Sequence, residues 1–148
     1  VARPRIGDDR LLLGLDFGPR KIGVAVGQTV TGTARPLKTL RSHGDKPDWA
    51  GIETLVREWR PSAVVLGLPL KLDDTPVDWA GQIHRFARQI QGRFGLPVHL
   101  IDERLTSVEA RSQLRSRPGG IPVDHLLEDA VAAALILETW LSEQAPDA

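Results

Sequence analysis

Residues 11–27, LLLGLDFGPRKIGVAVG, hold two apolar runs joined by a short turn. The runs at 11–17 and 21–27 are rich in Leu, Ile and Val, which predicts two buried strands that pair as a hairpin. The first run carries one carboxylate, Asp16, near its end. Because burying an unpaired carboxylate is costly, Asp16 must reach water, contact a cation or hold a metal. Asp16 is therefore the first candidate for chemistry.

The composition indicates a single globular domain. With 148 residues, 41% of them hydrophobic and 26% charged, the chain is long enough to bury one core. We expect one domain over 1–148, with its core at about 11–143. The absence of cysteine excludes disulfides, thiolate nucleophiles and zinc–thiolate sites. No stretch approaches the roughly 20 apolar residues of a membrane span, and VARPRIGDDR lacks an apolar signal core, so we expect a cytoplasmic protein.

The formal net charge is zero, but the charges are unevenly distributed. Residues 83–117 contain seven arginines and three acids, whereas residues 118–148 contain six acids and no lysine or arginine. Solvated helix faces produce such runs more often than binding sites do, and charge alone favours that interpretation.

The order of elements predicts the fold class. The predicted strands are 11–17, 21–27, 34–41, 63–68 and 97–102. The predicted helices are 48–59, 78–94, 106–117 and 125–143. Short connections make the first three strands an antiparallel meander, and intervening helices make the last two parallel. This order is typical of an α/β, ribonuclease-H-like fold: a five-stranded mixed sheet with helices on its faces.

Three acids interrupt apolar elements at positions suited to one site. Asp16 ends the first strand, Glu103 directly follows Asp102 at the end of the fifth, and Asp129 lies in the apolar last helix. Functional groups gather at the carboxyl ends of parallel strands. With no lysines among them, three carboxylates repel one another unless a divalent cation lies between them, and oxygen ligands suit Mg²⁺ or Mn²⁺. Such a site can hydrolyse phosphodiester bonds.

Each acid also has a purely structural explanation. Asp16 can cap the turn at Gly18, Glu103 can pair with Arg104 or Arg111, and Asp129 can pair with His125. Asp73, after the fourth strand, is an alternative metal ligand, although a solvated turn is the simpler explanation there. The four histidines show no metal-ligand spacing. For any acid alone the structural explanation is preferable, but for all three together we prefer the site.

Five motifs together identify a family. They are LGLDFGPRKIGVAVG, TGTARPL, VVLGLPL, DERLTSVEAR and EDAVAAALILE, in this order between Leu11 and Trp140. They resemble the successive motifs of the YqgF family, the bacterial Holliday-junction-resolvase-like proteins described as pre-16S ribosomal RNA nucleases. The resemblance implies a ribonuclease-H-like fold, a cytoplasmic location and endonuclease activity in maturing the 5′ end of small-subunit ribosomal RNA. The family's acidic residues fall on Asp16, Glu103 and Asp129.

Nucleic acid is the implied partner, either precursor ribosomal RNA or branched DNA, together with ribosomal particles; the chain itself is expected to be a monomer or a weak homodimer. Phosphate contacts are expected from seven cations. These are Arg20, Lys21, Arg85, Arg88, Arg104, Arg111 and Arg115. A binding factor without catalysis is the competing hypothesis of another class.

The chain also departs from the family pattern. Pro19 replaces a small hydroxyl residue in the first turn, and Lys71 replaces a polar amide after GLPL. The loop RPGGIPVD lacks the usual lysines, for which Arg115 and Arg117 can substitute. The first turn also resembles the phosphate loop of actin-like ATPases, but those enzymes need two lobes of this fold and 148 residues supply one.

Overall fold

A computed structural model describes residues 10–18, 20–44, 46–68, 80–102 and 125–144. Its strands are β1 (Leu11–Phe17), β2 (Lys21–Gln28), β3 (Thr33–Arg41), β4 (Ala63–Leu68) and β5 (Val98–Asp102). Its helices are α1 (Trp49–Trp59), α2 (Ala80–Phe94) and α4 (His125–Gln144). All five predicted strands are confirmed within a residue at each end. The helix predicted at 106–117 lies outside the described residues.

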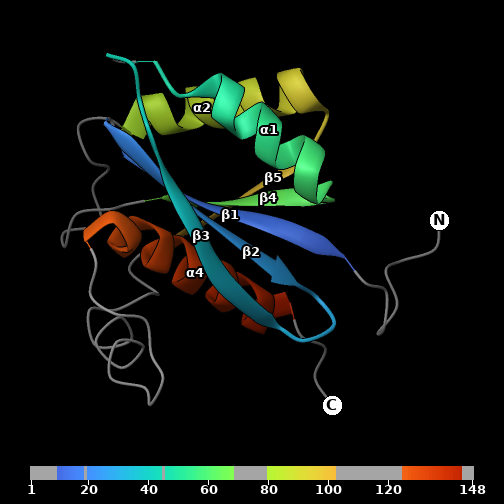
Figure 1. Cartoon of the computed structure of the whole chain (residues 1–148). Coiled ribbons are helices and arrows are strands. Elements are labelled where there is room, and N and C mark those ends of the chain that lie inside the picture. Colours follow the sequence, from blue (N-terminus) through green and yellow to red (C-terminus); the bar gives the residue numbers. More distant parts are fainter. Residues whose placement is uncertain (1–9, 19, 45, 69–79, 103–124, 145–148) are drawn as a thin grey trace.

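The strands form one mixed sheet in the order β3-β2-β1-β4-β5. β1 pairs with β2, and β2 with β3, in antiparallel fashion, whereas β4 lies parallel to both β1 and β5. Helices α1 and α2 cover one face of the sheet and α4 covers the other (Figure 1). The predicted ribonuclease-H-like layout is therefore confirmed.

Local signals set the ends of α1 and α2. The Asp48 side chain caps α1 by accepting a hydrogen bond from the Gly51 backbone N–H at 3.0 Å. At the other end Arg60 takes a left-handed conformation, with φ 46°, directly before Pro61, which cannot continue a helix. α2 ends in the same way, because Gly95 has φ 66° and its N–H donates to the Gln91 carbonyl.

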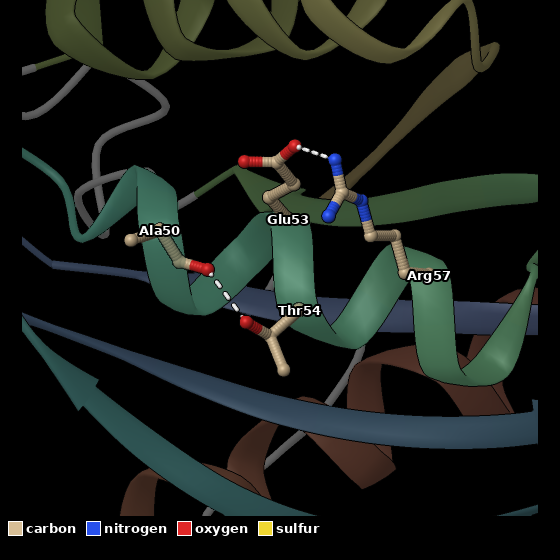
Figure 2. Close-up of polar contacts among 4 residues, drawn as sticks. All are labelled: Ala50, Glu53, Thr54 and Arg57. Atoms are coloured by element: carbon tan, nitrogen blue, oxygen red, sulfur yellow. Dashed lines mark hydrogen bonds and ion pairs between the residues drawn. The ribbon is translucent and has the colours of Figure 1, made fainter.

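The solvent side of α1 carries local polar contacts (Figure 2). Arg57 pairs with Glu53 at 2.8 Å one turn away, and the Thr54 hydroxyl donates to the Ala50 carbonyl at 2.9 Å. Exposed pairs of this kind stabilise a helix by only about 0.3–0.5 kcal/mol. Burial of Ile52 and Leu55 against the sheet therefore holds α1 in place.

The larger core lies between the sheet and the α1 and α2 layer. Leu13, Leu15 and Phe17 of β1 point into it, and Phe17 packs on Phe86 of α2 with ring centroids 4.7 Å apart. Side chains alternate along a strand, so the other residues of β1 point toward α4. Leu12 is one of these, and it packs in a second core against the buried apolar residues of α4.

Small residues let α4 approach the sheet closely. Gly14, Ala25 and Gly27 lie under the helix, where a Cβ on Gly14 would come within 2.9 Å of the Ala133 carbonyl. Ala133 and Ala134 of α4 pack on Ala25 in return. The alanines of α4 therefore let its backbone lie close to the sheet. No helix within the described ranges is long and apolar enough to span a membrane.

Candidate functional site

Asp16 lies on the α4 face of the sheet, at the carboxyl end of β1. Its strand neighbours Leu15 and Phe17 point into the opposite core, so alternation directs Asp16 toward α4. The side chain is partly buried. β1 is a central strand, flanked by β2 and β4. Asp16 therefore lies at the carboxyl end of a rigid central strand, where it can bind a ligand.

Asp129 is held beside Asp16 by the packing of α4. Asp16 pairs in register with Gly23 of β2. A Cβ added to Gly23 would overlap the carbonyl group of Asp129, so the helix backbone rests directly on this glycine. The structure thus brings two of the three predicted acids, from β1 and α4, to one end and one face of the sheet.

A lysine is already present at this position. Lys21 Nζ lies 3.0 Å from Asp129 Oδ2, with side chains 54% and 25% exposed. Oδ2 itself is buried, and the ion pair with Lys21 is its polar contact within the described residues. The expectation of acids without a nearby lysine is therefore wrong for Asp129. β2 carries Lys21 across the turn onto the α4 face, which the sequence spacing did not reveal.

A second cation that the sequence analysis missed lies next to Lys21. In the β2–β3 ladder Lys21 pairs in register with Arg41, whose neighbour Leu40 points into the opposite core. Arg41 is exposed and lies on the α4 side by alternation. Arg20 is exposed as well, and its carbonyl accepts a hydrogen bond from the Ser42 N–H at 2.9 Å. The expected hairpin pairing of the second and third strands could have predicted the position of Arg41, because it places the end of the third strand opposite the start of the second.

Arg85 and Arg88 lie elsewhere. Both are exposed on α2, whose buried face of Ile83, Phe86 and Ile90 packs on the sheet opposite α4 (Figure 1). The sheet therefore separates these two arginines from Asp16 and Asp129. The structure does not bring them together with the carboxylates, and their predicted role in binding nucleic acid stays a prediction.

The remaining predicted site residues lie outside the described part of the chain. These are Glu103, Arg104, Arg111 and Arg115, together with the alternative ligand Asp73 and the side chain of His125. Asp102, the last residue of β5, is described; since Ile101 packs in the α4 core, Asp102 points to the other face. Among the described residues no group of three or more metal-ligating side chains forms. His99 stacks on Trp140 with centroids 4.9 Å apart, which agrees with a packing role.

Comparison with curated proteins gives close relatives over almost the whole chain. A protein named "Putative pre-16S rRNA nuclease" from Azotobacter vinelandii is 52% identical over 135 residues, covering 91% of this chain and 95% of the relative. The protein of the same name from Pseudomonas putida KT2440 is 51% identical over 138 residues, covering 92% and 97%.

Solved structures share the fold at low identity. RuvC of Thermus thermophilus in complex with a Holliday junction substrate has a TM-score of 0.61 at 19% identity, covering 90% of this chain and 96% of that chain. The fowlpox virus resolvase in complex with Holliday junction DNA has a TM-score of 0.58 at 10% identity, covering 92% and 99%. The RuvX family, described as Holliday junction resolvases, matches residues 10–143. The resemblance inferred from the motifs is thus confirmed, and the chain belongs to the RuvX family.

Proposed function

We propose that this chain is a metal-dependent endonuclease that hydrolyses phosphodiester bonds during 5′-end maturation of pre-16S ribosomal RNA. The observation that carries the proposal is that Asp16 and Asp129 lie on one face and at one end of the sheet, on either side of the contact between Gly23 and α4. Relatives at 52% and 51% identity carry the corresponding nuclease name.

The donors present fit a hard divalent cation. Asp129 Oδ2 is a buried carboxylate oxygen that accepts no hydrogen bond from the described residues, so it has lone pairs to offer. Asp16 supplies a second carboxylate from β1. Mg²⁺ and Mn²⁺ favour carboxylate oxygens and keep several water ligands. We assign the metal to Asp16, Asp129 and Glu103, the last on the family resemblance.

Each residue then has a separate role. Asp16 and Asp129 hold the ion against the rigid sheet, and the bound ion supplies Lewis-acid stabilisation of the phosphodiester and of the leaving oxygen. Lys21 and Arg41 bring positive charge to the face that carries the carboxylates and attract the phosphate backbone, and the phosphate contact predicted for Arg20 belongs to the same proposal. The contacts predicted for Arg104, Arg111 and Arg115 extend this surface.

Branched DNA is the second candidate substrate. The solved structures with the same fold include two in complex with Holliday junctions, and the family itself is described as Holliday junction resolvases. The relatives at about half identity carry the ribosomal RNA name instead, and identity at that level is the stronger guide to substrate. We therefore place precursor RNA first. Action as a monomer or weak homodimer on ribosomal particles in the cytoplasm belongs to the same proposal.

A direct cleavage assay tests the proposal. Purified protein is incubated with a 16S RNA transcript carrying its 5′ leader, and separately with a four-way DNA junction, in Mg²⁺, Mn²⁺ or chelator. We expect metal-dependent cuts in the leader and none with chelator. Cleavage of the junction alone would indicate a resolvase. RNA binding without cleavage by either metal would indicate a binding factor and contradict the proposal.

A further inference from the structure

We propose that Lys21 is a positioning residue that occupies the cation position beside Asp129 in the metal-free protein and leaves that position when a divalent cation binds. This inference rests on the metal site of the proposed function. It adds that the site carries its own exchangeable counter-ion, supplied by β2.

The contact itself is the first step. The Lys21 ammonium lies 3.0 Å from Oδ2, the oxygen of Asp129 that is buried. A buried carboxylate oxygen without hydrogen-bond donors is costly unless a positive charge compensates it. Within the described residues Lys21 provides that charge. It therefore compensates the charge of Asp129 when no metal is bound.

The two partners differ in freedom of movement. Asp129 is fixed, because its backbone rests on Gly23 and the following residues of α4 are buried. Lys21 is more than half exposed, and a lysine side chain carries its charge on a flexible stem. The ammonium can therefore move into water without leaving a cavity. If one partner gives way to an incoming ion, it is Lys21.

The ion and the ammonium exclude each other. Mg²⁺ binds carboxylate oxygens at about 2.0–2.1 Å. An ammonium on the same oxygen would lie within a few ångströms of the ion, where repulsion between the two is strong in a partly buried site. Binding of the ion consequently displaces Lys21. The displaced ammonium remains on the face that carries Arg41, where a phosphate group is its natural counter-ion.

Metal binding without nucleic acid tests the exchange. Lys21→Met keeps the length of the stem and removes the charge. We expect Mn²⁺ to bind Lys21→Met about fivefold more tightly or better, the lower end of typical coupling between two sites. In chelator the same variant should melt at a lower temperature than wild type, because Oδ2 no longer has its cation. A residue with a purely structural role would not tighten metal binding.

Lys38→Met is the matched control. Lys38 is exposed on β3 and lies on the face of the sheet away from α4. It is two residues from Leu40, which points into the α1 and α2 core, and residues two apart in a strand share a face. Its loss changes the net charge equally, so we expect its Mn²⁺ affinity to stay within about twofold of wild type, as for surface charges that are distant and screened. Lys21→Arg should also stay near wild type, because it retains a cation beside Asp129. Lys21→Gln replaces Lys21→Met if the latter does not fold.

Three results would overturn the inference: unchanged or weaker Mn²⁺ binding in Lys21→Met, an equal gain in Lys38→Met, or no Mn²⁺ binding in either wild type or Lys21→Met. Failure of the nuclease proposal gives a different result. A wild type that shows the exchange with Mn²⁺ and cuts no RNA would contradict the proposed reaction and leave the role of Lys21 standing.

Discussion

Gly23 of β2 lies directly beneath the backbone of Asp129 in α4, so that a Cβ on this glycine would overlap the Asp129 carbonyl. Gly23 also pairs with Asp16 in the β1–β2 ladder. This glycine thus sets how close the α4 backbone at Asp129 comes to β2, beside Asp16. The geometry of the proposed site therefore depends on this packing contact as well as on the acids.

Gly23→Ala should therefore destabilise the protein and disturb the site. Inserting a methyl group against helix backbone has no flexible neighbour to yield, and overpacking of this kind costs about 1–3 kcal/mol. We expect a loss at the upper end of that range in denaturant unfolding, with weaker metal-induced stabilisation of the folded remainder. Gly92→Ala is the control. Gly92 lies in α2 with open space around it, and the change should stabilise by about 0.5–1 kcal/mol. Equal effects of the two changes would refute the packing argument.

Asp16→Asn should abolish metal-dependent cleavage while the fold is retained. The change removes a charge and keeps the shape, so it opens no cavity. We expect cleavage to fall at least about 100-fold, since losing even an outer partner of a metal ligand typically costs about 10–100-fold. Asp102→Asn makes the same chemical change at the end of β5 on the other face of the sheet, and should cleave nearly as wild type. Thermal melts of both variants check the fold, and full activity in Asp16→Asn would remove Asp16 from the site.

Arginines on the two sides of the sheet should differ in substrate binding. Removing a side chain that binds one phosphate reduces the slope of log affinity against log salt by about 1. We expect this reduction for Arg41→Ala, which pairs with Lys21 on the α4 side, and for Arg20→Ala, whose phosphate contact the sequence predicts. For Arg85→Ala and Arg88→Ala the position on the outer face of α2, across the sheet from the carboxylates, favours the wild-type slope over the phosphate contacts predicted from the sequence, and a reduced slope would confirm those contacts. Filter binding of the RNA transcript across a salt series measures all four, and a reversed pattern would mean that nucleic acid binds over α2.

Periodicity and end signals were sufficient to predict the sheet, but they could not predict which side chains meet across it. Asp48 and Gly95 act locally, so the ends of α1 and α2 could be predicted from neighbouring residues. The Lys21–Asp129 pair joins the first hairpin to the last helix, and depends on how close α4 approaches. Likewise, the arginine-rich segment is continuous in the sequence, yet α2 carries Arg85 and Arg88 to the far layer. Spacing in the sequence does not show which layer of the fold a side chain belongs to, because the layers form only when the elements pack.

The ion pair with Lys21 also determines how substitution of Asp129 should change the stability of the protein. Without metal, Asp129→Asn removes one partner of a pair whose lysine is 54% exposed, so we expect a cost of at most about 1 kcal/mol. With Mg²⁺ at about 100 times its dissociation constant, wild type should gain about 2.7 kcal/mol and the variant almost none. The difference in stability between wild type and Asp129→Asn should therefore be larger in Mg²⁺ than in chelator, as measured by thermal melts under both conditions. Glu138→Gln, on the same helix near β3, is the control and should gain as much from Mg²⁺ as wild type. If Asp129→Asn gains as much as well, Asp129 is not a ligand, and Asp73 becomes the candidate for its place.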